Sequence, residues 1–104
     1  MRDLVFVVDR QKIYADPECD FSGIVRGTHG YLRAVFKFKE GWSGYKRAVS
    51  FFDAHGGETA MPLVGDACEI PACVLGGGVF YVSVAGMKGN SIMKTNRATV
   101  RQGR

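Results

Sequence analysis

The sequence predicts an all-β fold, a mostly antiparallel β-sandwich of Ig-like or jelly-roll-like type formed by a single domain, residues 1–104. Three observations carry this prediction. Apolar and polar side chains alternate along several short segments, as they do on strands with one buried face. Turn sequences rich in Gly and Asn separate these segments, which is typical of sandwiches and small barrels. The chain is 46% hydrophobic, enough for one core at this length.

The alternation is clearest in YLRAVFKFK, residues 31–39, and in VFYVSVA, residues 79–85. In each segment every second residue is apolar, so one face of each strand is expected to be buried. Together with Ile70, the inward-facing set expected from this pattern is Leu32, Ala34, Phe36, Phe38, Phe80, Val82 and Val84.

The remaining strands are bounded by turn sequences such as HGG at residues 55–57 and KGN at residues 88–90. Further strands are expected at residues 4–8, 12–14, 21–26, 45–52, 59–64, 92–95 and 97–101. One short helix is expected near residues 71–75, because Pro71 suits a first helical turn and Gly76 suits a helix end. Pro71 should also end the strand that precedes it.

Residues that could carry catalysis or bind a metal are sparse. The chain has three cysteines, so complete internal disulfide pairing is impossible and free thiols in a reducing compartment are expected. His29 and His55 lie far from one another and from Cys68 and Cys73, which does not match zinc-site spacing. The glycines at 76–78 lead into a strand, whereas a phosphate-binding loop leads into a helix. We therefore expect no enzymatic activity, no cofactor, no metal and no small-molecule substrate.

Charge and hydropathy place few constraints on function. The formal net charge is +4, from 14 Lys and Arg against 10 Asp and Glu, which favours anionic partners without naming one. The opening MRDLVFVVDRQK has too short an apolar run for a signal peptide, and no run reaches the ~20 apolar residues of a membrane-spanning helix. We expect a protein made in a cytoplasm that does not interact with membranes.

The segment FKFKEGWSGYKRAVSFF, residues 36–52, admits two interpretations. Aromatic side chains among basic ones suit the binding of single-stranded nucleic acid, in which bases stack on rings and cations follow phosphates. Trp42, Tyr45, Tyr81 and the neighbouring Lys and Arg would then form the binding surface of an OB-like barrel. Alternatively the segment is a corner of the sandwich, with Trp42 folded over the open end of the core and the charges directed outward. We favour the corner and keep nucleic acid as the alternative function.

The order of motifs along the chain resembles a known module. An alternating aromatic strand precedes WSGYKRAVSF, a polar hairpin follows, and CEIPACVL and GVFYVSVAG come before a Thr95-Asn96 segment and a last strand. This order is similar to that of the small β-sandwich at the N-terminus of upper-baseplate and tail-fibre-attachment proteins in phages of Gram-positive bacteria and in prophages. The resemblance covers residues 22–101, and its motifs are mostly structural.

The resemblance implies a non-enzymatic virion or assembly component such as a baseplate, tail, head-fibre or decoration subunit. Its partners would be other phage structural proteins, within a symmetric assembly in which the chain forms a homo-oligomer. It would be located in the virion after synthesis in the host cytoplasm. Multi-domain relatives continue into a stalk or receptor-binding region, whereas this chain ends at Arg104, so no host-recognition domain is expected.

Residues expected at loops or on outward strand positions are candidates for the protein–protein interface. These candidates are Tyr14, Phe21, Tyr31, Tyr45, Tyr81, Arg101 and Arg104. The structural positions expected to hold the sandwich together are Trp42, Phe36, Phe38, Ile70, Pro71, Phe80 and Val82.

Overall fold

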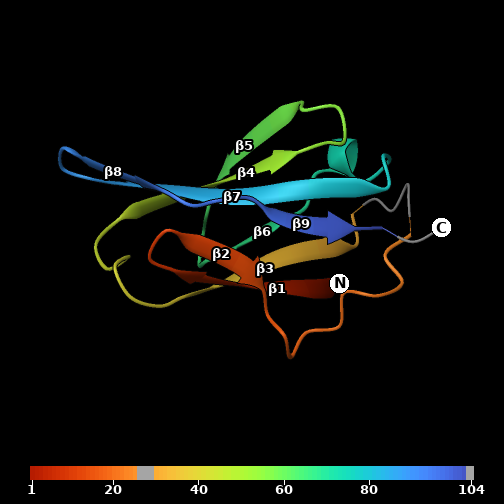
Figure 1. The fold of residues 1–104 in the computed structure, drawn as a ribbon, viewed down its shortest axis with the longest axis horizontal. Coiled ribbons are helices and arrows are strands. Elements are labelled where there is room, and N and C mark those ends of the chain that lie inside the picture. Colours follow the sequence, from red (N-terminus) through yellow and green to blue (C-terminus); the bar gives the residue numbers. More distant parts are fainter. Residues whose placement is uncertain (26–29, 103–104) are drawn as a thin grey trace.

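The computed structural model describes residues 1–25 and 30–102 and confirms the prediction of an all-β sandwich (Figure 1). Two mostly antiparallel sheets pack against each other and enclose one hydrophobic core. The elements are β1 (Arg2–Asp9), β2 (Lys12–Ala15), β3 (Leu32–Phe38), β4 (Lys46–Phe52), β5 (Glu58–Pro62), β6 (Ala67–Glu69), the 3-10 helix η1 (Ala72–Val74), β7 (Val79–Lys88), β8 (Ser91–Lys94) and β9 (Ala98–Arg101).

The four-stranded sheet has the order β2-β1-β3-β6, and the second sheet has the order β5-β4-β7-β8. In Figure 1 the strands β1, β2 and β3 lie below β4, β5 and β7. The ten-residue strand β7 pairs with β8 along its C-terminal part and with β9 along its N-terminal part. Strands β1 and β3 are parallel, and every other strand pair is antiparallel.

Alternation along the strands builds the core between the sheets. Every second residue of β3 and β7 points inward, and Phe36, Phe80, Val82 and Val84 are almost wholly buried. Phe38, at the end of β3, is half-buried against the same core. The largest fully buried side chains are Trp42, Phe6, Phe51, Phe80, Leu4, Ile24, Leu32, Ile70, Leu75, Val8, Val49 and Val74.

The strand expected at residues 21–26 is wrong: residues 21–24 have no strand structure, Val25 forms only an isolated bridge, and Arg26 lies outside the described residues. Local side-chain bonds hold this segment in turns instead. The carboxylate of Asp20 accepts hydrogen bonds from the backbone N–H and the hydroxyl of Ser22, and Gly23 has a φ of 67°. The apolar side chains nevertheless reach the core, because Ile24 is buried and Phe21 packs edge-on against Phe6.

Two other boundaries differ from the sequence-based expectation. The strand expected at residues 59–64 ends at Pro62, and Val64 makes only an isolated bridge to Ala67. The helix near residues 71–75 is a single 3-10 turn at Ala72–Val74, which Pro71 precedes with an extended backbone. Pro71 lacks an N–H and so cannot extend the ladder of β6, which ends the strand before the helix begins.

Candidate protein-interaction surface

The two sheets present different surfaces to solvent. The side chains of β4 and β7 that point away from the core form what we call the outer face, together with the outward residues of β5, β8, β9 and the β8–β9 connection. The residues of the outer face are Lys46, Ala48, Ser50, Phe52, Glu58, Ala60, Pro62, Val79, Tyr81, Ser83, Ala85, Met87, Ile92, Lys94, Arg97, Thr99 and Arg101.

Small side chains form the floor of the outer face. Ala48 pairs with Ala85 across β4 and β7, and Ser50 pairs with Ser83 one step further along. Because these side chains rise little above the backbone, the surface over them is hollowed. One hollow of about 500 Å³ lies over all four residues, and a second of about 290 Å³ continues from Ala48 and Ala85 toward the β7–β8 hairpin.

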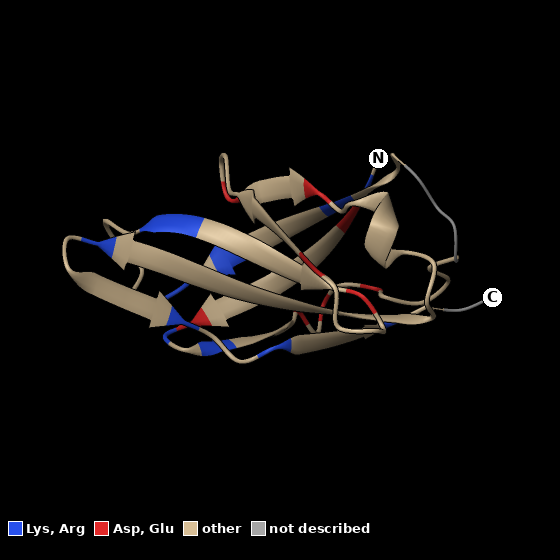
Figure 2. Cartoon of the chain, turned by 90° about the horizontal axis from the view of Figure 1, so that it is seen from above, with Lys and Arg blue, Asp and Glu red and all other residues tan. Residues whose placement is uncertain are grey.

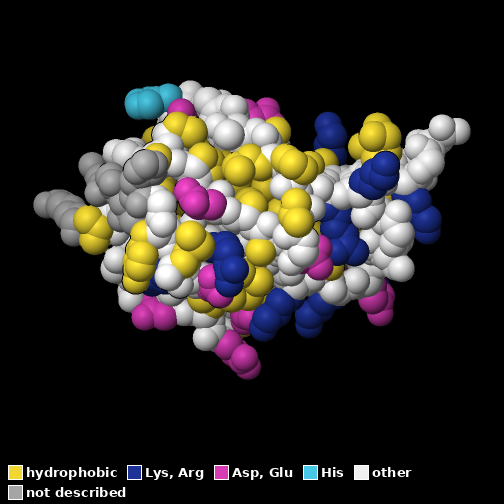
Figure 3. Space-filling view, turned by 180° about the vertical axis from the view of Figure 1, so that it is seen from behind, with side chains coloured by type: hydrophobic (Ala, Val, Ile, Leu, Met, Phe, Trp, Pro, Cys, Tyr) yellow, Lys and Arg dark blue, Asp and Glu magenta, His cyan; other side chains and the backbone are white. Residues whose placement is uncertain are grey.

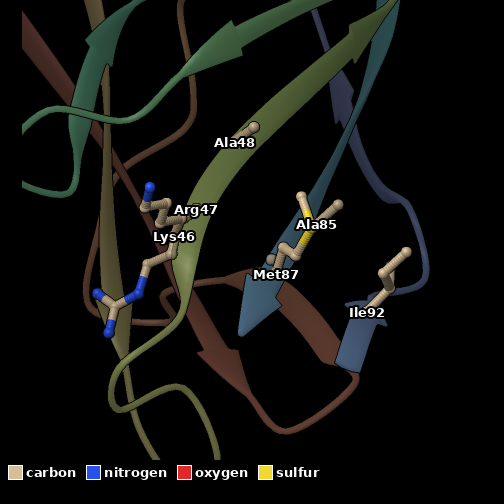
Figure 4. Close-up of a pocket in the computed structure, with 7 residues that line it drawn as sticks. Lys46, Arg47, Ala48, Ala85, Met87 and Ile92 are labelled. Carbon is tan, nitrogen blue, oxygen red and sulfur yellow. The ribbon is translucent and has the colours of Figure 1, made fainter. Parts of the chain in front are cut away.

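Apolar side chains stand at the hairpin end of the outer face. Met87 of β7 and Ile92 of β8 are register partners, with 54% and 68% of their surfaces exposed. Figure 4 shows both on the same side of the hairpin as Ala85, while the guanidinium of Arg47 points away from them. Exposed large side chains beside a small-residue floor form a surface that can bury apolar groups of another molecule.

The charges of the outer face are mostly cationic and unpaired. Lys46, Lys94 and Arg101 make no ion pair with any described residue. The Arg97 guanidinium lies over the ring of Phe52, 3.7 Å from its centroid. The single acidic residue of the face, Glu58, accepts a hydrogen bond from the Ser50 hydroxyl. The face therefore carries four cations and one carboxylate.

The opposite face, on the four-stranded sheet, carries two ion pairs. The Arg33 guanidinium donates to both carboxylate oxygens of Asp3, and Nζ of Lys37 lies 2.7 Å from Oδ2 of Asp16. The Asp16 carboxylate also accepts the backbone N–H of Glu18 and is largely buried, and these partners hold its pKa below the ordinary value for aspartate. Exposed ion pairs such as Arg33–Asp3 contribute little to stability, but they leave no free charge at these positions for a partner.

Lys and Arg side chains also concentrate toward one end of the molecule, that of the β7–β8 hairpin. In Figure 2 several Lys and Arg residues lie near the tip of the β7–β8 hairpin and at the start of β4. Seen from behind in Figure 3, hydrophobic side chains gather in the middle of the molecule, and most of the Lys and Arg side chains lie toward the hairpin end.

The sheet edges offer little backbone for strand addition. On β5, Pro62 has no N–H to donate, which is a common protection of edge strands. On β2, the side-chain amide of Asn96 bonds both the N–H and the carbonyl of Ile13. On β8, the Gln11 side chain donates to the carbonyl of Lys94. Strand β6 is three residues long. The outer face is therefore the candidate interaction surface of the described residues.

Residues 36–52 form a corner of the sandwich. Trp42 is fully buried and its indole N–H donates to the carbonyl of Arg10 at 2.7 Å. The guanidinium of Arg47 lies 4.1 Å from the Phe38 ring centroid, donates to the carbonyl of Trp42 and pairs with Asp66. A base cannot stack on a ring with no exposed surface, so Trp42 does not supply the stacking platform required by the nucleic-acid interpretation.

The candidate interface residues fall on different parts of the surface. Tyr14 and Tyr31 are 42% and 52% exposed, on the side of the four-stranded sheet. Tyr45 is half-buried against Trp42, and Phe21 against Phe6. Only Tyr81 and Arg101 lie on the outer face, paired across β7 and β9 with Thr99 and Val79. Arg104 lies outside the described residues.

The small-residue floor and the exposed pair Met87 and Ile92 were not predicted from the sequence. Ala48, Ala85, Met87 and Ile92 each occupy an outward position of a strand, where the alternation alone predicts an ordinary solvated residue. Only the pairing of β4 with β7 places the two alanines side by side. A signal was present in the outward positions after Tyr81, which are Ser83 and Ala85 rather than charged residues.

The thiols and acidic groups are dispersed over the described residues. No cluster of three or more His, Cys, Asp or Glu side chains that could hold a metal ion is found there. The three cysteines are free, and burial raises the pKa of the Cys68 thiol to about 11, so it stays protonated at neutral pH. Within the same residues no helix has the length and hydrophobicity needed to cross a membrane.

Comparisons with protein-family models, curated proteins and solved structures give no match for this chain.

Proposed function

We propose that this protein is a non-enzymatic structural subunit that acts through protein–protein contacts within a larger assembly. A phage virion is the specific assembly implied by the resemblance of its motifs to the baseplate module. In that setting the chain is made in the bacterial cytoplasm and incorporated into a baseplate, tail, head-fibre or decoration position, in symmetric copies.

The observation that carries this proposal is the contrast between the two faces of one sandwich. The opposite face pairs its two arginine and lysine side chains on β3 within the chain, through Asp3–Arg33 and Asp16–Lys37, and leaves Lys12 and Lys39 without an ion pair to a described residue. The outer face instead leaves Lys46 and Lys94 unpaired beside the exposed Met87 and Ile92. The exposed apolar groups gain from being covered by another protein, and the cations beside them can pair with carboxylates of that protein at the rim of the contact.

Purified particles test the proposal directly. We expect the chain to co-purify with phage particles through a density gradient in a fixed ratio to the other structural proteins, measured by quantitative mass spectrometry. A symmetric assembly requires an integral copy number per symmetry unit. A chain that remained in the soluble fraction, or whose ratio varied between preparations, would contradict the proposal.

A matched pair of variants connects particle incorporation to the outer face. Lys94→Glu reverses a charge on this face, whereas Lys12→Glu reverses an exposed charge on β2, on the side of the four-stranded sheet. We expect incorporation to fall for Lys94→Glu and to stay unchanged for Lys12→Glu. Equal incorporation of both variants would remove the outer face from the proposal.

A further inference from the structure

We infer that the outer face binds a segment of a different protein in which large apolar side chains are flanked by Asp or Glu. This inference rests on the proposed function, and it names the chemistry of the partner at the same surface.

The shape of the outer face fits apolar side chains. The two hollows share Ala48 and Ala85, so they form one continuous depression along β4 and β7. A partner side chain that enters it contacts the methyl groups of these alanines and, at the hairpin end, the side chains of Met87 and Ile92. Burial of apolar area there would supply most of the affinity, at roughly 25 cal/mol per Å² before the costs of association.

The charge of the outer face fits carboxylates beside those apolar groups. Lys46 stands at one end of the depression, and Lys94 and Arg97 line its side at the β8–β9 connection. Lys46 and Lys94 have no carboxylate partner among the described residues, and Glu58 is already bonded by Ser50. Carboxylates of a partner would meet these cations at the rim, where charge complementarity directs association and selects the partner.

The same charges argue against a second copy of this chain on the face. Two outer faces in a twofold contact would place four cations and one carboxylate against an identical set. Like charges opposed across an interface are unfavourable, so homotypic contacts within an assembly must use another surface.

Nucleic acid and lipid fit the outer face less well than protein. Its aromatic side chains are Phe52, which lies under Arg97, and Tyr81, which is half-buried, so the face has no row of open rings on which successive bases could stack. A membrane-binding surface inserts an extended set of large apolar side chains, whereas Met87 and Ile92 are the only large apolar side chains of the outer face that are mostly exposed among the described residues.

Selection from a random peptide library on the purified protein tests the partner chemistry. We expect the enriched peptides to combine Asp or Glu with Leu, Ile, Phe or Met. One enriched peptide, added to isotope-labelled protein, should shift the amide NMR signals of residues 48, 50, 83 and 85. Its Kd should weaken about tenfold or more in Lys46→Glu/Lys94→Glu and change less than about twofold in the control Lys12→Glu/Lys39→Glu.

All four lysines are exposed and make no ion pair with a described residue, so both double variants should fold, which their NMR spectra check. The inference is overturned if the enriched peptides lack acidic residues, if no peptide is enriched, or if the shifts fall on the four-stranded sheet. It is also overturned if oligothymidylate or phosphatidylglycerol vesicles bind the face more tightly than the peptide, or if the protein self-associates through it.

The outcome is separable from the test of the proposed function. A chain that binds acidic apolar peptides but is absent from particles keeps this inference and loses the virion proposal. A chain found in particles at fixed ratio, whose selected peptides lack acidic residues, keeps the proposal and loses this inference.

Discussion

The side-chain amide of Asn96 pairs with Ile13 as a neighbouring strand would. Its oxygen accepts the Ile13 N–H at 2.8 Å, and its nitrogen donates to the Ile13 carbonyl at 3.3 Å. The preceding residue, Thr95, bonds both backbone groups of Val84 in the other sheet, one through its hydroxyl and one through its own N–H. Two adjacent residues thus fasten the sheets together along one side of the sandwich.

Replacement of Asn96 should lower the stability of the whole domain. Asn96→Ala removes both bonds to Ile13, and at about 0.5–1.5 kcal/mol per bond we expect a loss of about 1–3 kcal/mol in the free energy of unfolding. Urea titration followed by circular dichroism measures this loss. Thr99→Ala, a substitution at an exposed position of β9, is the control and should change the free energy by less than about 0.5 kcal/mol. An Asn96→Ala variant as stable as this control would show that the pairing contributes nothing.

Gly86 is required by the packing of Trp42. A Cβ at residue 86 would lie 2.7 Å from Cζ3 of the indole, closer than van der Waals contact allows. Gly86→Ala should therefore destabilise the protein by about 1–3 kcal/mol through overpacking. Gly76→Ala is the matched control, because a Cβ there meets nothing within 4 Å and the backbone is not left-handed. The comparison is made on the midpoints of urea unfolding of the two variants. Equal midpoints would contradict a close approach of the Trp42 indole to residue 86.

A double-mutant cycle assigns the clash to the indole. In a Trp42→Phe background the smaller ring has fewer atoms near Gly86. The loss in free energy of unfolding caused by Gly86→Ala should therefore fall by at least half. Trp42→Phe alone should also be destabilising, because it leaves the carbonyl of Arg10 without its indole donor. An unchanged cost of Gly86→Ala in this background would place the strain elsewhere, for example against Tyr45, whose Cβ lies 3.2 Å from the same position.

Asp16 should make stability depend on pH in the acidic range. Its hydrogen bonds to Lys37 and to the N–H of Glu18 lower its pKa in the folded protein below the value of about 3.9 expected for an unfolded chain. The ionised form therefore stabilises the fold fully above that value, and the contribution is lost as the pH falls through the folded pKa. We expect wild type to be more stable than Asp16→Asn at neutral pH and the difference to shrink progressively below pH of about 4. The midpoints of urea unfolding at a series of pH values measure this difference in stability between wild type and Asp16→Asn. A difference that stayed constant with pH would show that the carboxylate charge is not involved.

The sandwich could be predicted from the sequence because the alternation of apolar and polar residues is a local pattern. Strand β7 shows the clearest case, since every second residue from Phe80 to Val84 is both apolar and buried. Pro71 and the glycines after Leu75 likewise restrict the helix to one short turn through backbone chemistry that a few residues determine. The strand pattern failed at residues 21–25, where the side chain of Asp20 bonds Ser22 and turns the backbone although Ile24 still reaches the core.

The outer face could not be predicted in the same way because it depends on pairing between distant strands. Ala48 and Ala85 are 37 positions apart, and each is an unremarkable outward residue of its own strand. Tyr14 and Tyr31 matched the expectation of exposure, but they lie on the side of the four-stranded sheet rather than on the hollowed face. Which strands are neighbours is a tertiary property, and alternation identifies only which residues point outward.

The burial of Trp42 gives the clearest prediction against the nucleic-acid alternative. Because the only tryptophan has no exposed surface, its fluorescence should be emitted at short wavelength and should resist quenching by iodide until urea unfolds the chain. Adding single-stranded oligothymidylate should leave this emission unchanged. Any residual attraction should come from the net charge of +4 and disappear as salt is raised.

A base stacked on Trp42 would instead quench the emission at saturation, with binding that weakens by about 1–3 kcal/mol in Trp42→Ala. The buried ring gives the opposite expectation for this variant, a loss of about 3–5 kcal/mol in folding stability. Saturable quenching of the folded protein by the oligonucleotide would therefore contradict the corner assignment and restore nucleic acid as the leading function.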